Sequence, residues 1–170
     1  MSNKKEIIEI IITGGTIDSY YEVTKDTVVP LKKSVIPEFI KSLKIESNFS
    51  FNEICMKDSR SINKVDLNKI LNIINKTNSK KIIITHGTYT MPDTARFLEA
   101  RLKVKDKVII LTGSMIPLTG FSPSDAPFNL GYSIASLQTL NSGIYVCMNG
   151  QIFTPKEVIK RVSEGRFVSV

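Results

Sequence analysis

Short, unbroken apolar runs alternate along the chain with segments whose apolar residues recur at the spacing of a helix. The runs occupy residues 6–13, 51–56, 81–85, 107–112 and 143–149. Because they are continuous rather than alternating, they are typical of strands buried on both faces. Helices are predicted between them, over residues 36–43, 67–74, 91–102 and 130–137.

This alternation predicts a doubly wound α/β fold, with one parallel sheet, helices on both of its faces and the first run as its central strand. A further helix is predicted near the end of the chain. Residues 154–157 read Thr-Pro-Lys-Glu, which is a capping box with proline at the first helical position. We therefore expect a last short helix that carries Lys160 one turn further on.

The composition is that of one ordinary globular domain. The 170 residues are 42% hydrophobic and 23% charged, and no apolar run approaches the roughly 20 residues of a membrane span. The basic start leads into a short β-branched run, which favours a first strand over a signal peptide. Cys55 and Cys147 lie in apolar, strand-like stretches, so we expect free, buried thiols and a reducing, cytoplasmic location.

The net charge of +7 raises the question of nucleic acid. The lysines are scattered over predicted helix faces and strand starts, and no basic block is interleaved with aromatic residues. That pattern indicates a solvated surface and no nucleic-acid partner. The excess of positive charge can still attract an anionic or zwitterionic substrate.

Polar turns rich in glycine, serine and threonine follow the first four predicted strands. They span residues 13–18, 57–61, 85–90 and 112–115. Any one of them is typical of a plain strand-to-helix connection. Because ligands of such folds bind at the carboxyl ends of the strands, four polar turns at one sheet edge indicate a site there.

Several kinds of chemistry are poorly supplied. His86 is the single histidine, so a zinc site would lack ligands and a Ser-His-Asp triad would depend on this residue. The glycine turn at residues 13–18 has neither the dinucleotide-binding nor the phosphate-loop spacing. What remains is a threonine nucleophile activated by something other than histidine, with lysine or tyrosine as the candidates.

Four short motifs resemble the bacterial-type L-asparaginase and glutaminase family: TGGTI at 13–17, HGT-TM at 86–91, LTGSM-P at 111–117 and PFNL at 127–130. The resemblance implies a flavodoxin-like amino-terminal domain, hydrolysis of a side-chain amide through a threonine acyl-enzyme, no metal or organic cofactor, and assembly as a homodimer at least. The chain ends about where that first domain ends. Residues 1–170 are therefore expected to form a single-domain version of the family.

The resemblance also implies roles for individual residues. Thr16 and Thr88 are implied as the two catalytic threonines, and Lys160 as the catalytic lysine. Either Tyr20 or Tyr21 is implied to activate the first threonine, and Tyr21 is taken into the predicted site. The predicted substrate-binding residues are Gly15, Asp58, Ser59, Gly87, Tyr89 and Ser114.

Position 89 departs from the family, whose aspartate here is Tyr89. A neutral phenol cannot pair with the α-ammonium group of an amino-acid substrate, and its ring is larger. Three interpretations follow: an amide without a free α-amine, weak activity, or loss of catalysis in a module that binds a small metabolite. Asp58 and Asp125 are candidates for a substitute carboxylate. We expect Tyr89 in the mouth of the site, beside Thr88.

Overall fold

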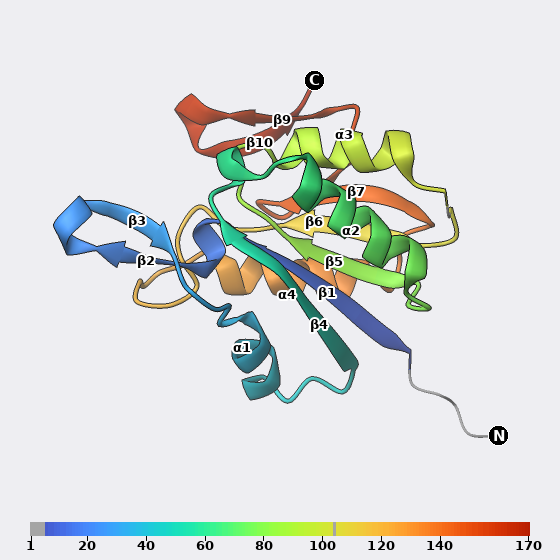
Figure 1. Cartoon of the computed structure of the whole chain (residues 1–170), viewed down its shortest axis with the longest axis horizontal. Helices are drawn as coiled ribbons and strands as arrows, with labels where there is room; N and C mark the ends of the chain where they lie inside the picture. Colours follow the sequence, from blue (N-terminus) through green and yellow to red (C-terminus); the bar gives the residue numbers. More distant parts are fainter. Residues whose placement is uncertain (1–5, 104) are drawn as a thin grey trace.

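A single sheet organises the computed structural model, which describes residues 6–103 and 105–170. Its strand order is β4-β1-β5-β6-β7-β8 (Figure 1). The bounds are β1 Ile7–Gly14, β4 Asn48–Lys57, β5 Lys81–Thr85, β6 Val108–Thr112, β7 Gly143–Met148 and β8 Gln151–Phe153. Neighbouring strands are parallel except for β7 and β8. All five predicted runs are strands of this sheet, and the doubly wound, flavodoxin-like α/β fold is confirmed.

The predicted central place of the first strand is wrong. β1 lies next to the edge strand β4, and β5 and β6 occupy the middle of the sheet. After β4 the chain crosses over β1 to place β5 on its other side, and every later strand extends the sheet in that direction. Both middle strands are almost entirely buried.

Helices cover both faces of the sheet (Figure 1). Their bounds are α1 Ile36–Ser42, α2 Lys64–Lys76, α3 Met91–Arg101 and α4 Ala126–Ser136. Successive residues of a strand point to opposite faces: Ile11 packs in the cluster that contains α2 and α3, whereas Ile10 and Ile12 pack in the cluster that contains α1 and α4. The four predicted helices are thus confirmed, each through its apolar stripe.

The start of α2 is fixed to the end of β4. Asn63 accepts hydrogen bonds from the backbone N–H groups of Val65 and Asp66, and Asp66 accepts one from the N–H of Asn63, which is a complete capping box. The buried carboxylate of Asp66 also lies 2.7 Å from Lys57 Nζ, at the last residue of β4. This ion pair holds the turn after β4, where Asp58 and Ser59 lie, against the helix.

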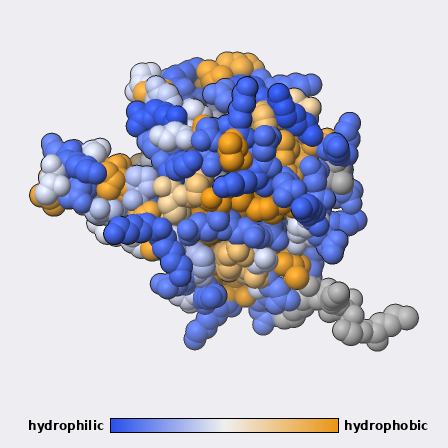
Figure 2. Space-filling model, in the orientation of Figure 1, coloured by the Kyte–Doolittle hydropathy of each residue, from blue (hydrophilic) through white to orange (hydrophobic). Residues whose placement is uncertain are grey.

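Two antiparallel hairpins were not predicted. β2 (Ser19–Glu22) pairs with β3 (Thr27–Pro30), and β9 (Val158–Arg161) pairs with β10 (Arg166–Ser169). The β2–β3 hairpin projects from the body of the molecule (Figures 1 and 2). The β9–β10 hairpin lies beside α3.

The predicted last helix is wrong, because residues 158–161 form β9 and Lys160 stands on a strand. The capping contact is present, since the N–H of Thr154 donates to Glu157 at 2.7 Å, but it supports only one turn. Val158, Ile159 and Val162 are β-branched, which favours a strand. Gly165, with φ of 61°, allows the tight return to β10.

Packing attaches the β9–β10 hairpin to the body. The Phe167 ring is buried in the same cluster as α2 and α3. The backbone N–H of Phe167 donates to Asn149 Oδ1 at 3.0 Å. From α3, Arg96 Nη2 donates to the carbonyl of Val158 at 2.7 Å. The position of Lys160 therefore depends on contacts made by its neighbours on both strands.

Two further predictions concern the cysteines and membrane-spanning segments. Cys55 and Cys147 are free, as predicted, with Cys147 buried and Cys55 partly buried. Within residues 6–103 and 105–170, no helix is both long and apolar enough to span a bilayer.

Truncating Phe167 tests the attachment of the hairpin. Phe167→Ala is expected to lower the free energy of unfolding by about 3–5 kcal/mol, because it leaves a cavity in the core. Val162→Ala, at a side chain 66% exposed on the same hairpin, should change it by less than about 0.5 kcal/mol. Urea unfolding measures both, and similar small losses would show that the Phe167 ring does not anchor the hairpin.

Candidate active site

A cavity of about 220 Å³ lies at the carboxyl ends of β4, β1 and β5. The chain leaves β1 and β5 in opposite directions across the sheet, which is the switch point where ligands of such folds bind. Residues from three turns and both hairpins line it: Gly15, Thr16, Thr27, Val28, Asp58, Ser59, Arg60, Gly87, Thr88, Tyr89 and Lys160.

Two glycines let the three turns meet. A Cβ on Gly15 would lie 2.4 Å from the Cα of Gly87, and a Cβ on Gly87 would lie 2.7 Å from the Cβ of Ser59. Gly15 also has φ of 83° and ψ of −175°, a conformation that is essentially restricted to glycine. Its N–H donates to the carbonyl of Lys57 at 2.9 Å. The backbones thus approach more closely than any side chain would allow.

His86 fixes the shape of the turn after β5. Its ring is fully buried, with Nδ1 2.8 Å from the carbonyl oxygen of Gly87 and Nε2 3.0 Å from Thr94 Oγ1. Burial lowers the pKa of His86 to about 4, against the opposing effect of the contact with Gly87. The ring is therefore neutral at pH 7, and it does not line the cavity.

The clearest chemical pair in the cavity is Thr88 and Lys160. Lys160 Nζ lies 2.7 Å from Thr88 Oγ1 and donates to it. Partial burial lowers the pKa of Lys160, the nearby charge of Arg60 lowers it further, and Asp58 opposes the shift. A lysine with a lowered pKa beside a hydroxyl is the arrangement that activates a hydroxyl nucleophile.

Arg60 is a cavity residue that the sequence reasoning missed. It pairs with Asp58 through two contacts, Nε to Oδ1 at 3.0 Å and Nη2 to Oδ2 at 2.9 Å. Its guanidinium lies 5.4 Å from the centre of the Tyr89 ring, and Lys160 Nζ lies 5.8 Å from the same centre. The sequence feature that could have identified Arg60 is its position in the polar turn at residues 57–61, directly after Ser59.

Most of the predicted site residues lie together. Thr16, Thr88, Lys160, Gly15, Asp58, Ser59, Gly87 and Tyr89 line the cavity. Ser59 is buried, and its carbonyl accepts a hydrogen bond from Thr90 Oγ1 at 3.0 Å. Tyr89 is 57% exposed beside Thr88, where it was expected.

The other predicted residues lie outside the cavity. The hydroxyl of Tyr21 donates to Asp26 and that of Tyr20 to Glu22 at 2.9 Å, so both are engaged within the β2–β3 hairpin. Ser114 is buried behind β6 and donates to the carbonyl of Ile116. Tyr20 and Tyr21 lie on β2, and Ser114 lies two residues after the end of β6. None of these positions lines the cavity.

Asp125, one candidate for a substitute carboxylate, also lies outside the cavity. It accepts hydrogen bonds from the backbone N–H groups of Met115 and Ile116, at 2.9 Å each, and from Asn129 at 3.0 Å. Its carboxylate thus holds the turn after β6 against the start of α4. Asp58, the other candidate, lines the cavity but is paired with Arg60.

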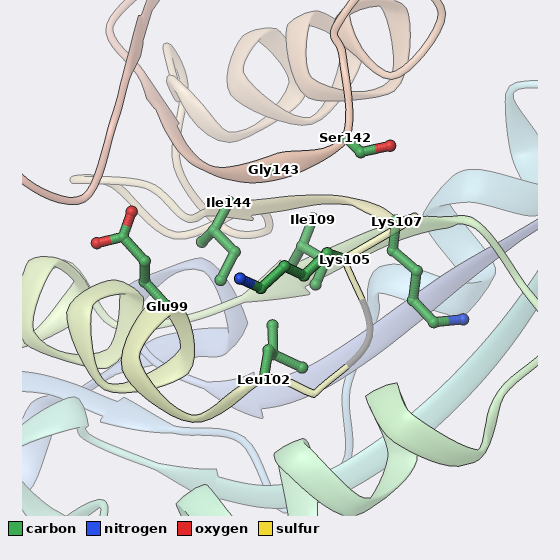
Figure 3. Close-up of a pocket in the computed structure, with 8 residues that line it drawn as sticks. All are labelled: Glu99, Leu102, Lys105, Lys107, Ile109, Ser142, Gly143 and Ile144. Atoms are coloured by element: carbon green, nitrogen blue, oxygen red, sulfur yellow. The ribbon is translucent and has the colours of Figure 1, made fainter.

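A second hollow, of about 230 Å³, lies at the opposite edge of the sheet, near the amino ends of β6 and β7 (Figure 3). Two lysines, Lys105 and Lys107, line it. Lys107 Nζ donates to the carbonyls of Thr77 and Ser79 at 2.7 and 2.8 Å and points away from Glu99. This hollow holds no hydroxyl paired with an amine. The two hollows have similar volumes, so the pair of Thr88 and Lys160, rather than size, favours the cavity at the ends of β4, β1 and β5. Across residues 6–103 and 105–170, no cluster of three or more His, Cys, Asp or Glu could hold a metal ion.

Comparisons with known proteins point to one family. A family model described as "Asparaginase, N-terminal" matches residues 7–167. The glutaminase-asparaginase of Acinetobacter glutaminasificans is 31% identical over 94% of this chain and 51% of its own length. L-asparaginase 2 of Escherichia coli is 32% identical over 90% of this chain and 46% of its own length. The chain thus spans about half the length of these relatives.

Solved structures show the same likeness. The probable cytoplasmic L-asparaginase of Campylobacter jejuni superposes with a TM-score of 0.82 at 27% identity, over 97% of this chain and 53% of that one. The thermostable L-asparaginase of Thermococcus kodakarensis gives 0.79 at 27% identity, over 96% and 51%.

The contact between the two glycine turns predicts a loss of stability. Gly120→Ala, at φ of 79° with open space around it, should cost about 1–2 kcal/mol for backbone conformation alone. Gly15→Ala adds a clash with the backbone of Gly87 and should cost at least about 1 kcal/mol more. Urea unfolding measures the difference. Equal losses in the two variants would contradict the close approach.

Proposed function

This chain belongs to the asparaginase family, and we propose on that basis that it hydrolyses the side-chain amide of L-asparagine or a related compound to a carboxylate and ammonia. The observation that carries the proposal is the pairing of Lys160 Nζ with Thr88 Oγ1 at 2.7 Å, in a cavity that Thr16 also lines. The names of the relatives, L-asparaginase and glutaminase-asparaginase, support a side-chain amide as the substrate.

In the first step, Thr16 Oγ1 attacks the carbonyl carbon of the amide. Its proton passes through the hydroxyl of Thr88 to Lys160, and returns to the nitrogen as the C–N bond breaks. Ammonia leaves, and an ester joins the acyl group to Thr16. In the second step, water attacks the ester, and the proton it loses follows the same path back to Thr16. The products are a carboxylic acid and ammonia, and the chain is regenerated.

Thr88 is given the relay role because its hydroxyl already contacts the amine. Among the described residues, no partner holds the hydroxyl of Thr16. A threonine hydroxyl is a poor nucleophile at neutral pH and needs a base within hydrogen-bond reach. The tyrosines implied by the resemblance lie outside the cavity, so the mechanism uses Lys160 as its base.

A second candidate function is a module that binds a small metabolite without turnover. Tyr89 favours it, because a neutral ring occupies the mouth of the cavity beside Thr88. The retention of Thr16, Ser59, Thr88 and Lys160 around one cavity favours the enzyme. Substitution of the two threonines separates the enzyme from the binding module.

We also propose, from the sequence and the resemblance, a single domain over residues 1–170, a cytoplasmic location and assembly as a homodimer.

Thr16→Ala and Thr88→Ala should each reduce ammonia release by about 10²-fold or more, since each removes the nucleophile or the relay. Thr139→Ala changes an exposed threonine after α4 and should leave the rate unchanged. Ammonia release from L-asparagine and other amides measures all three. Full activity in both cavity variants would exclude this mechanism. A wild-type protein that binds these amides but hydrolyses none would favour the binding module.

The lowered pKa of Lys160 predicts the pH dependence. The amine must be neutral to accept a proton, so kcat/KM should rise with pH and level off above the pKa of Lys160, which lies below the ordinary 10.5. Arg60→Gln removes a positive charge that lowers this pKa, so the rise should move to higher pH. A pH–rate profile that is unchanged in this variant would contradict the role of Lys160 as the base.

A further inference from the structure

The charges that line the cavity favour an anion over a cation. Among the lining residues, those with a carboxylate, a guanidinium or an amine are Asp58, Arg60 and Lys160. Arg60 is a permanent cation, whereas Lys160 must be neutral to act as the base, and Asp58 is the one carboxylate. Tyr89, which also lines the mouth, adds a neutral ring.

The one carboxylate is already paired with a neighbouring cation. Asp58 Oδ1 accepts from Arg60 Nε at 3.0 Å and from the backbone N–H of Arg60 at 2.8 Å. Asp58 Oδ2 accepts from Arg60 Nη2 at 2.9 Å. Both oxygens are thus engaged by the same residue. An ammonium group in this cavity would lie near the guanidinium of Arg60 and would have to share the carboxylate of Asp58 with it.

The guanidinium, in contrast, is held ready for an anion. Asp58 takes Nε and one N–H of Nη2, which leaves Nη1 and the second N–H of Nη2 for a ligand. The Tyr89 ring lies under the guanidinium at 5.4 Å and limits its rotation. A planar guanidinium with adjacent free N–H groups matches the two oxygens of a carboxylate.

We propose that Arg60 binds a carboxylate of the substrate and that the preferred substrate is an amide that carries a carboxylate and no ammonium group. The proposal rests on the proposed amide hydrolysis at Thr16, Thr88 and Lys160. It assigns to Arg60 the selection of the substrate. The simplest such compound is succinamate, which is asparagine without its α-amine.

Size and overall charge agree with this class of substrate. A cavity of about 220 Å³ is smaller than the roughly 300–1,000 Å³ of sites for drug-sized ligands, so it suits a small dicarboxylic monoamide. The net charge of +7 attracts anions to the molecule from a distance.

The test compares kcat/KM for succinamate and L-asparagine by ammonia release. The wild-type protein is expected to prefer succinamate by at least about tenfold, because both substrates offer a carboxylate to Arg60 but only L-asparagine also brings an ammonium group into the cavity. A tenfold preference corresponds to about one charge-assisted hydrogen bond. Arg60→Gln should lower kcat/KM for succinamate by about tenfold or more, mainly through KM. The same change frees Asp58 for an ammonium, so the ratio of the two substrates should fall. Because the ratio is taken at one pH, the effect of Arg60 on Lys160 cancels.

Arg101→Gln is the matched control. Arg101 also lies over an aromatic ring, 4.3 Å from the centre of Phe97, but it stands on α3 and does not line the cavity. This variant should keep the ratio of the wild-type protein. An equal fall for both substrates in Arg60→Gln would show that Arg60 does not select between them and would overturn the proposal.

Calorimetric titration with succinate separates this proposal from the proposed function, because succinate carries no amide and cannot be hydrolysed. Succinate should bind the wild-type protein and bind Arg60→Gln at least about tenfold more weakly. If that holds but no amide releases ammonia, the selection of an anion by Arg60 stands and the hydrolysis is wrong. If asparagine and succinamate are hydrolysed equally well and succinate binds both proteins equally, the hydrolysis stands and the role of Arg60 is wrong.

Discussion

One hydrogen bond, from Lys160 Nζ to Thr88 Oγ1, joins residues 72 positions apart in the chain and gives the cavity its chemistry. It forms only if the turn after β5 and the β9–β10 hairpin are both held in place. Gly15 and Gly87 bring the turns after β1 and β5 into backbone contact. Phe167 and Arg96 hold the hairpin against the body. The lysine is thus placed by packing at residues that take no part in the chemistry.

Burial gives the same lysine its reactivity. A solvated lysine is protonated at neutral pH and cannot accept a proton, whereas partial burial and the charge of Arg60 lower the pKa of Lys160. Arg60 therefore has two effects in one place, on the base and on any charged substrate. The Tyr89 ring lies near both Arg60 and Lys160, and a side chain that is larger than aspartate and neutral is compatible with a ligand that brings no ammonium group.

The sheet could be predicted from the sequence because its strands are continuous β-branched runs such as Ile10–Ile12 and Ile82–Ile84, whose burial on both faces leaves a clear pattern. The hairpins could not, because β2, β3, β9 and β10 are four residues long and mix polar with apolar side chains. The capping box at Thr154 was misleading for a physical reason: its hydrogen bond to Glu157 forms, but β-branched residues follow and the chain pairs with β10 instead.

Strand ends were enough to bring Thr16, Ser59 and Thr88 to one edge of the sheet, because parallel strands end there together. The positions of Tyr21 and Arg60 depend on side-chain pairings with Asp26 and Asp58, which no spacing in the sequence reveals.

The most direct measurement is ammonia release by the wild-type protein and by Lys160→Met, which keeps much of the side-chain volume and removes the amine. Hydrolysis by the wild-type protein and a loss of about 10²-fold or more in the variant is the predicted result. Equal rates in the two proteins, or no ammonia from either, would contradict it.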